Sequence, residues 1–232
     1  MDDEPFPEEP PHRGKTRILI ELAAIVFILW LPSFIGALSG FTAPYSYSPP
    51  GLLPLDIAYS LLTRLSKVVL IGYVVWRSSK GMSFFGFRRP RFRDIPIAVG
   101  LWFGLVLVEN FGAYLTAPLH HLPGAVHHAS GPDRESGIVL IVLLLAAAAS
   151  EESLFRCYLC TRFTQLGDPP WLVVTLSSLM FASIHIYQGW SHLIPSFAFG
   201  SVLAVVFLNY RSIWPLILAH AGYNLWIWSY PG

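Results

Sequence analysis

Residues 137–164 read GIVLIVLLLAAAASEESLFRCYLCTRFT, an apolar run interrupted near its middle by Glu151, Glu152 and Arg156. A hydrocarbon core of about 30 Å is crossed by about 20 helical residues, so the length of this run predicts a transmembrane helix. A charged side chain at the centre of a membrane costs about 3 kcal/mol even on the most lenient insertion scale. The three charged residues therefore need partners or a function.

The composition of the whole chain is that of a membrane protein. Of its 232 residues, 54% are hydrophobic and 12% are charged, whereas about a quarter are charged in soluble domains. A net charge of +1 argues against nucleic-acid binding and leaves the lipid bilayer as the expected environment. We predict an all-α fold, a polytopic transmembrane helix bundle of about seven spans (six to eight): 18–38, 54–76, 95–117, 137–164, 171–187, 192–209 and 213–229.

The distribution of basic residues predicts the orientation of these spans. If the N-terminus is cytoplasmic, only Arg134 lies in an outer loop, and eleven cations face the cytoplasm: Arg13, Lys15, Arg17, Arg77, Lys80, Arg88, Arg89, Arg91, Arg93, Arg162 and Arg211. This bias follows the positive-inside rule and predicts a multi-pass protein of the cell membrane with a cytoplasmic N-terminus. We divide the chain into a disordered cytoplasmic tail (1–17), N-terminal transmembrane helices and loops (18–136) and a catalytic helical core (137–232).

Helical spacing separates the two adjacent glutamates. Residues four apart lie on one face of an α-helix, so Glu152 and Arg156 are expected to pair. Glu151 is rotated by about 100° around the helix and points elsewhere. One carboxylate is then neutralised while the other stays free.

Polar residues on two further spans are expected at a similar depth. At about 1.5 Å per residue from the cytoplasmic ends, Glu151, His185 and Asn224 lie about 17–21 Å deep, with His220 about a turn away. A carboxylate beside an imidazole in a low-dielectric cavity suits water activation. Asn224 and His220 are suited to donating hydrogen bonds to an oxyanion, so the set favours hydrolysis of a peptide bond in a protein or peptide substrate.

Other functions use the same residue types. Each polar residue alone is compatible with a hydrogen bond between helices. A line of Glu, His and Arg at mid-membrane is also typical of proton or ion pathways. The alternative to an endopeptidase is therefore a non-catalytic, transport or immunity protein that uses the same polar cluster.

Three motifs resemble those of the CPBP family, which comprises the CAAX prenyl proteases and the bacterial Abi or bacteriocin-processing relatives. The family pattern is EExxxR, FxxxH and HxxxN on separate helices, and it is matched here by 151–156, 181–185 and 220–224. The similarity covers about residues 137–228. It implies that Glu151 and His185 activate water and that His220 and Asn224 stabilise the oxyanion. It also implies that Glu152 and Arg156 hold the charge and geometry of the site.

Two further expectations concern metals and the remaining charges. Glu151, His185 and His220 would form a plausible Zn²⁺ set, but no HExxH motif is present and a metal-free site without a cofactor is favoured. Arg64 and Glu109 are expected at similar depths and predict a buried ion pair. The histidines of the outer loop are expected to be solvated, with adventitious metal binding as the alternative: His120, His121, His127 and His128.

Overall fold

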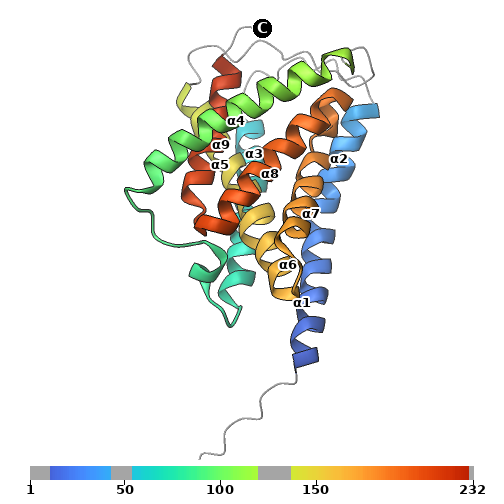
Figure 1. The fold of residues 1–232 in the computed structure, drawn as a ribbon, viewed down its shortest axis with the longest axis vertical. Helices are drawn as coiled ribbons and strands as arrows, with labels where there is room; N and C mark the ends of the chain where they lie inside the picture. Colours follow the sequence, from blue (N-terminus) through green and yellow to red (C-terminus); the bar gives the residue numbers. More distant parts are fainter. Residues whose placement is uncertain (1–10, 43–53, 120–136, 230–232) are drawn as a thin grey trace, which may run out of the picture.

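The computed structural model describes residues 11–42, 54–119 and 137–229, and within these ranges the regular structure is entirely helical (Figure 1). Arg134 and the four outer-loop histidines lie outside the described residues. The described residues form seven continuous helical segments: α1 (Pro11–Ile25) with a π-helical turn (Val26–Trp30) and α2 (Leu31–Thr42); α3 (Pro54–Trp76); α4 (Asp94–Thr116); α5 (Gly137–Glu152) with a π-helical stretch (Ser153–Cys160) and α6 (Thr161–Leu166); α7 (Pro170–Ser183); α8 (Trp190–Tyr210); and α9 (Trp214–Ser229). The predicted all-α bundle is confirmed.

Five of these segments are long and apolar enough to cross a membrane: Gly14–Phe41, Ile57–Trp76, Asp94–Leu119, Gly137–Leu166 and Trp190–Tyr210. The two remaining predicted spans, 171–187 and 213–229, correspond to α7 and α9, which have only 14 and 16 residues. Pro170 starts α7, and the chain leaves the helix after Ser183 to turn at Gly189, where φ is 97°. At about 1.5 Å per residue neither helix spans a core of about 30 Å.

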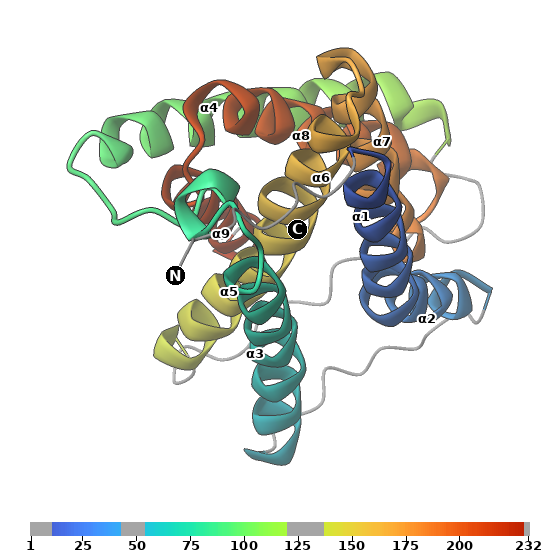
Figure 2. The same cartoon turned by 90° about the horizontal axis from the view of Figure 1, so that it is seen from below.

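The N-terminal segment is longer than expected. Helix α1 begins at Pro11, so residues 11–17, which the composition places in a tail, are helical. Its continuation through the π-helical turn into α2 forms one long rod beside α6 and α7 (Figure 1), which bends between α1 and α2 (Figure 2). Glu21 ties this rod to the bundle, because it accepts hydrogen bonds from the Tyr158 hydroxyl at 2.9 Å and the Arg162 Nε at 2.9 Å.

The C-terminal helices form the centre of the molecule. Helix α7 packs along α8, α4 packs across both α8 and α9, and α3 packs against α5, as the view from below shows (Figure 2). The outer surface stays apolar. Of the 18 most apolar consecutive residues of α3 only 6% are buried, and of those of the α1–α2 rod only 11% are buried. Such an exterior fits lipid, which offers no partners to polar groups.

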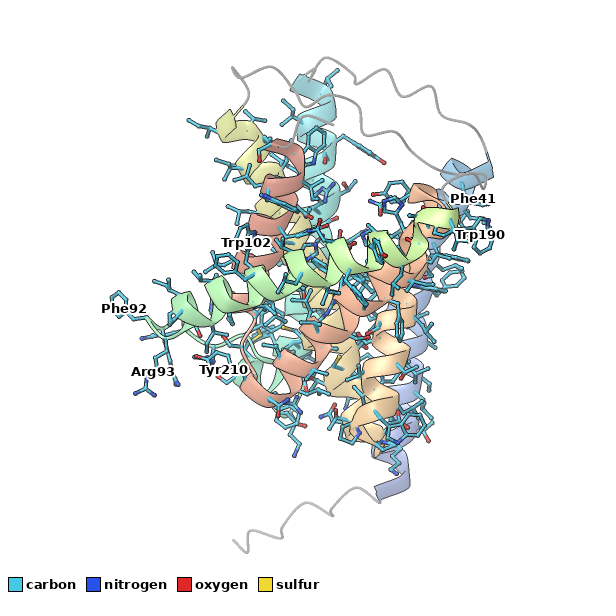
Figure 3. The ribbon with its side chains drawn as sticks, turned by 45° about the horizontal axis from the view of Figure 1, so that its top comes forward. Phe41, Phe92, Arg93, Trp102, Trp190 and Tyr210 are labelled. Atoms are coloured by element: carbon cyan, nitrogen blue, oxygen red, sulfur yellow. The ribbon has the colours of Figure 1, made fainter. Side chains whose placement is uncertain are left out.

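Different contacts join the helices at the two ends of the bundle. At one end, the Trp214 Nε1 donates to the Arg88 carbonyl at 2.6 Å, which joins the α3–α4 connection to the start of α9. Arg93 and Tyr210 lie toward this end in Figure 3. Phe41 and Trp190 make an edge-on ring contact at 5.4 Å elsewhere, where α2 ends and α8 begins (Figure 3).

Gly112 sets the distance between α4 and α8. A Cβ atom at this position would lie 2.9 Å from Pro195 Cγ and 3.1 Å from its Cα. We therefore expect Gly112→Ala to force the two helices apart and to lower the unfolding free energy by about 1–3 kcal/mol, measured by thermal unfolding in detergent.

Gly104→Ala is the matched control, because nothing lies within 4 Å of a Cβ at this position on the same helix. It is expected to leave stability unchanged or to raise it by up to about 1 kcal/mol through helix propensity. Equal melting temperatures for the two variants would contradict the close packing of α4 on α8.

Candidate active site

Glu152 lies at the centre of the bundle with its side chain fully buried. Its Oε2 is 3.3 Å from the Nε of Arg156, one turn further along the chain, and this is the pair that the spacing predicts. Its Oε1 is 2.8 Å from the Nδ1 of His220 on α9. Because an ionised carboxylate only accepts, the imidazole Nδ1–H donates this bond. Glu152 thus joins a cation on its own helix to an imidazole on another.

Arg156 is also fully buried and contacts two further helices. Its Nη2 donates to the Gly200 carbonyl on α8 at 3.3 Å, and its guanidinium lies 4.5 Å from the centroid of the Phe181 ring on α7. A Cβ at Gly200 would lie 3.2 Å from Phe181 Cδ1, so glycine lets α8 approach α7 closely enough for both contacts. The guanidinium is held by charge, one carbonyl and an aromatic face.

The residues after Glu152 form a π-helical stretch, which spacing analysis based on an α-helix does not predict. It spans Ser153–Cys160 and all eight of its residues are buried. The carbonyl of Phe155 accepts a hydrogen bond from the Ser177 hydroxyl of α7 at 2.9 Å. π-Helical turns are rare and often occur at functional sites.

Glu151 differs from its neighbour in exposure and in partners. Its side chain is 22% exposed, while that of Glu152 is 0% exposed. Its Oε2 lies 3.8 Å from the Nε2 of His220, too far for a hydrogen bond. Glu151 lines a cavity of about 300 Å³ between the α1–α2 rod, α3 and α5. The structure therefore makes Glu151 the accessible carboxylate of the pair.

His185 was expected within a helical span, but it lies outside the helix because α7 ends two residues earlier at Ser183. Its Nδ1 is 2.9 Å from the Phe181 carbonyl, one of the terminal carbonyls that a helix leaves without an internal partner. Since a carbonyl only accepts, Nδ1 carries the proton and Nε2 keeps its lone pair. The imidazole also lies within electrostatic range of the Glu151 carboxylate.

Asn224 is one turn beyond His220 on α9 and is partly exposed. Among the described residues, no hydrogen bond joins Asn224 to the other predicted site residues. The structure thus links Glu151, Glu152, Arg156 and His220 by charge and hydrogen bonds, and His185 joins them through the ring of Phe181.

Two cavity residues were not assigned to the site by the sequence. Arg64 and Lys67 on α3 line the same cavity as Glu151. The predicted ion pair between Arg64 and Glu109 is therefore wrong. Glu109 is on α4, within electrostatic range of Tyr223 on α9. The signal was present in the sequence, because two cations three residues apart inside an apolar span need a reason.

The donors for a metal ion are of the right types. Both imidazoles use Nδ1 as a donor and leave Nε2 free, the arrangement that is usual for histidine ligands of zinc. In the part of the chain that the structure describes, however, no three His, Cys, Asp or Glu side chains are gathered closely enough to hold a metal ion.

Comparison with known proteins agrees with the motifs. Residues 134–226 match the family described as Type II CAAX prenyl endopeptidase Rce1-like. No curated protein and no solved structure matches the chain. The matched range contains all six predicted site residues and runs from the start of α5 into α9. Residues 134–226 of this helical membrane protein are thus similar to the Rce1-like type II CAAX prenyl endopeptidases, in agreement with the resemblance of its three motifs.

Proposed function

We propose that the protein is an integral-membrane endopeptidase in which Glu151 and His185 activate the attacking water. The observation that carries this proposal is the difference between the adjacent glutamates. Glu152 is fixed by Arg156 at 3.3 Å and by His220 at 2.8 Å, which leaves Glu151 as the carboxylate that faces the cavity. Its partly exposed side chain is the one that water and substrate reach.

The protons are distributed as follows. The attacking water gives one hydrogen bond to Glu151 and one to the free Nε2 of His185, whose Nδ1 is held by the Phe181 carbonyl. Glu151 takes a proton as the water oxygen bonds to the scissile carbonyl carbon, and it returns that proton to the departing amine. The hydrogen bond to the Phe181 carbonyl holds the His185 ring in place before the substrate arrives.

Charge that develops on the carbonyl oxygen needs donors. The Asn224 amide supplies one, and His220 supplies a second through Nε2–H when both of its ring nitrogens are protonated. Its Nδ1–H bond to Glu152 fixes the ring orientation. Arg156 holds Glu152 in position but does not touch the reacting atoms.

Glu151→Gln and His185→Ala are expected to lower the cleavage rate of membrane-proximal peptides by at least about 1,000-fold in detergent, because each removes a group that holds the water. The matched control is Glu109→Gln, which removes a carboxylate within another span but away from the cavity. It should retain activity. Full activity in the Glu151→Gln variant would contradict the proposed mechanism.

We further propose that the site works without a metal, since the described donors are not gathered into a metal site. The expected result is that a zinc chelator leaves the cleavage rate unchanged and that added Zn²⁺ does not raise it. A rate that falls on chelation and returns with Zn²⁺ would contradict this, and would point to Glu151, His185 and His220 as ligands.

We propose a cell-membrane location with the N-terminus in the cytoplasm. The start of α1, the α3–α4 connection and α6 lie in the lower part of the molecule in Figure 1, and these segments carry basic residues, as the positive-inside rule requires of a cytoplasmic side. The native cysteines are buried, so they give little background in thiol labelling. In intact cells, Leu55→Cys should react with an impermeant reagent and Lys80→Cys should not. The reverse pattern would overturn the orientation.

A further inference from the structure

The α3–α4 connection, residues 77–93, is fixed to the bundle at its middle. Phe85 is fully buried, and the Gly86 carbonyl accepts a hydrogen bond from the Ile213 backbone N–H at 3.1 Å, just before α9. Gly86 has a φ of 86°, and a Cβ at this position would lie 2.6 Å from the Phe207 ring. The side chains that project from the connection are therefore presented on a fixed surface.

One cation of this connection is neutralised within the protein. Asp94 is the only acidic residue between positions 57 and 108, and it is buried. One of its oxygens accepts from the Arg88 guanidinium at 2.9 Å, and the other accepts from the Arg91 backbone N–H at 2.7 Å. Arg88 also lies over the Tyr210 ring, 4.8 Å from its centroid. Both oxygens of the carboxylate are thus in use.

Three further cations beside Arg88 have no such partner. The side chains of Arg89, Arg91 and Arg93 are exposed, and in the described part of the chain none of them forms an ion pair with a carboxylate. A guanidinium is always charged, and its planar fork matches the oxygens of a phosphate group. Three such groups on a fixed surface favour an anionic partner.

Phe92 defines the partner further. Its side chain is 92% exposed, and Figure 3 shows it near Arg93 at the outer edge of the molecule, directed away from the bundle. Exposed apolar residues continue from Phe92 along one face of α4 at intervals of three or four: Ile95, Val99, Phe103 and Leu107. Because α4 is long and apolar enough to cross a membrane, this face meets acyl chains, and Phe92 lies where the headgroups begin.

We propose that residues 89–93 bind the headgroup phosphates of anionic phospholipids, with Phe92 inserted at the boundary between headgroups and acyl chains. A cationic surface with an apolar side chain at its centre matches a ligand in which a negative charge adjoins an acyl chain. An acidic protein segment or a free phosphate ion would match the charges but would leave Phe92 in water. This proposal does not depend on the endopeptidase function.

The test titrates the purified protein in a neutral detergent with phosphatidylglycerol or phosphatidylcholine and measures each affinity by native mass spectrometry. Wild type should bind phosphatidylglycerol at least about 10-fold more tightly. Arg91→Gln combined with Arg93→Gln should weaken phosphatidylglycerol binding about 10- to 30-fold, because each arginine near an anionic headgroup contributes about fivefold. Binding of phosphatidylcholine should not change.

Lys15→Gln combined with Arg17→Gln is the matched control, since it removes two exposed cations at the same spacing from the start of α1. It should bind phosphatidylglycerol as wild type does. An equal loss in the two double variants would show attraction to net charge alone and would overturn the defined surface. Equal affinity of wild type for the two lipids would overturn it as well.

Phe92→Ser separates a lipid from other anions. It should weaken the binding of both lipids about 10-fold through lost apolar burial, while the preference for phosphatidylglycerol remains. Inorganic phosphate should not displace the lipid. Displacement by phosphate, with unchanged lipid binding in the Phe92→Ser variant, would assign the surface to soluble anions and overturn the proposal. Binding of phosphatidylglycerol that appears only after deletion of the acidic segment 2–9 would assign the surface to that segment, with the same result.

Thermal unfolding gives a second readout, because a lipid that binds only the folded protein raises its melting temperature. Without lipid, the Arg91 and Arg93 double variant should melt as wild type does, since Asp94 contacts the backbone N–H of residue 91 and not its side chain. Phosphatidylglycerol should raise the melting temperature of wild type and of the α1 control but not of this variant. An equal rise in all three proteins would contradict the proposal.

Discussion

A glutamate and an arginine that are removed completely from water impose the strongest constraint on this bundle. Glu152 and Arg156 each lose hydration on burial, and their mutual attraction offsets this cost only if further groups complete the shell. His220, the Gly200 carbonyl and the face of Phe181 contribute to that shell from α9, α8 and α7, while the Arg156 Nη1 has no hydrogen-bond partner among the described residues. Three helices thus contribute contacts to the two charged side chains.

The same constraint gives adjacent glutamates different chemistry. Glu152 takes Arg156 and the Nδ1 of His220, while Glu151 has only the Nε2 of His220 at 3.8 Å and keeps its open side toward the cavity. His185 contributes in a similar way, because capping the end of α7 fixes which of its nitrogens carries a proton. In both places, an ordinary structural requirement orients a functional group.

Most of the fold and much of the site were predictable from local pattern. Apolar length identified the seven helical segments, and four-residue spacing identified the contact between Glu152 and Arg156. The partner of Arg64 was predicted wrongly, because depth along a span does not reveal which helices are neighbours. The end of α7 before His185 and the π-helical stretches depend on contacts between segments far apart in sequence, which periodicity does not contain.

The π-helical stretch at Ser153–Cys160 has a consequence for how this protein can vary. A π-helical turn holds more residues than an α-helical turn, so converting the stretch to a regular helix requires removing a residue. Without that removal, a regular helix would rotate everything downstream by about 100° relative to Glu152, and would carry Arg162 away from Glu21. The number of residues in this stretch is therefore less free to change than the identity of its side chains. A designer who made this helix regular would gain backbone order but would detach the N-terminal rod from the catalytic helices.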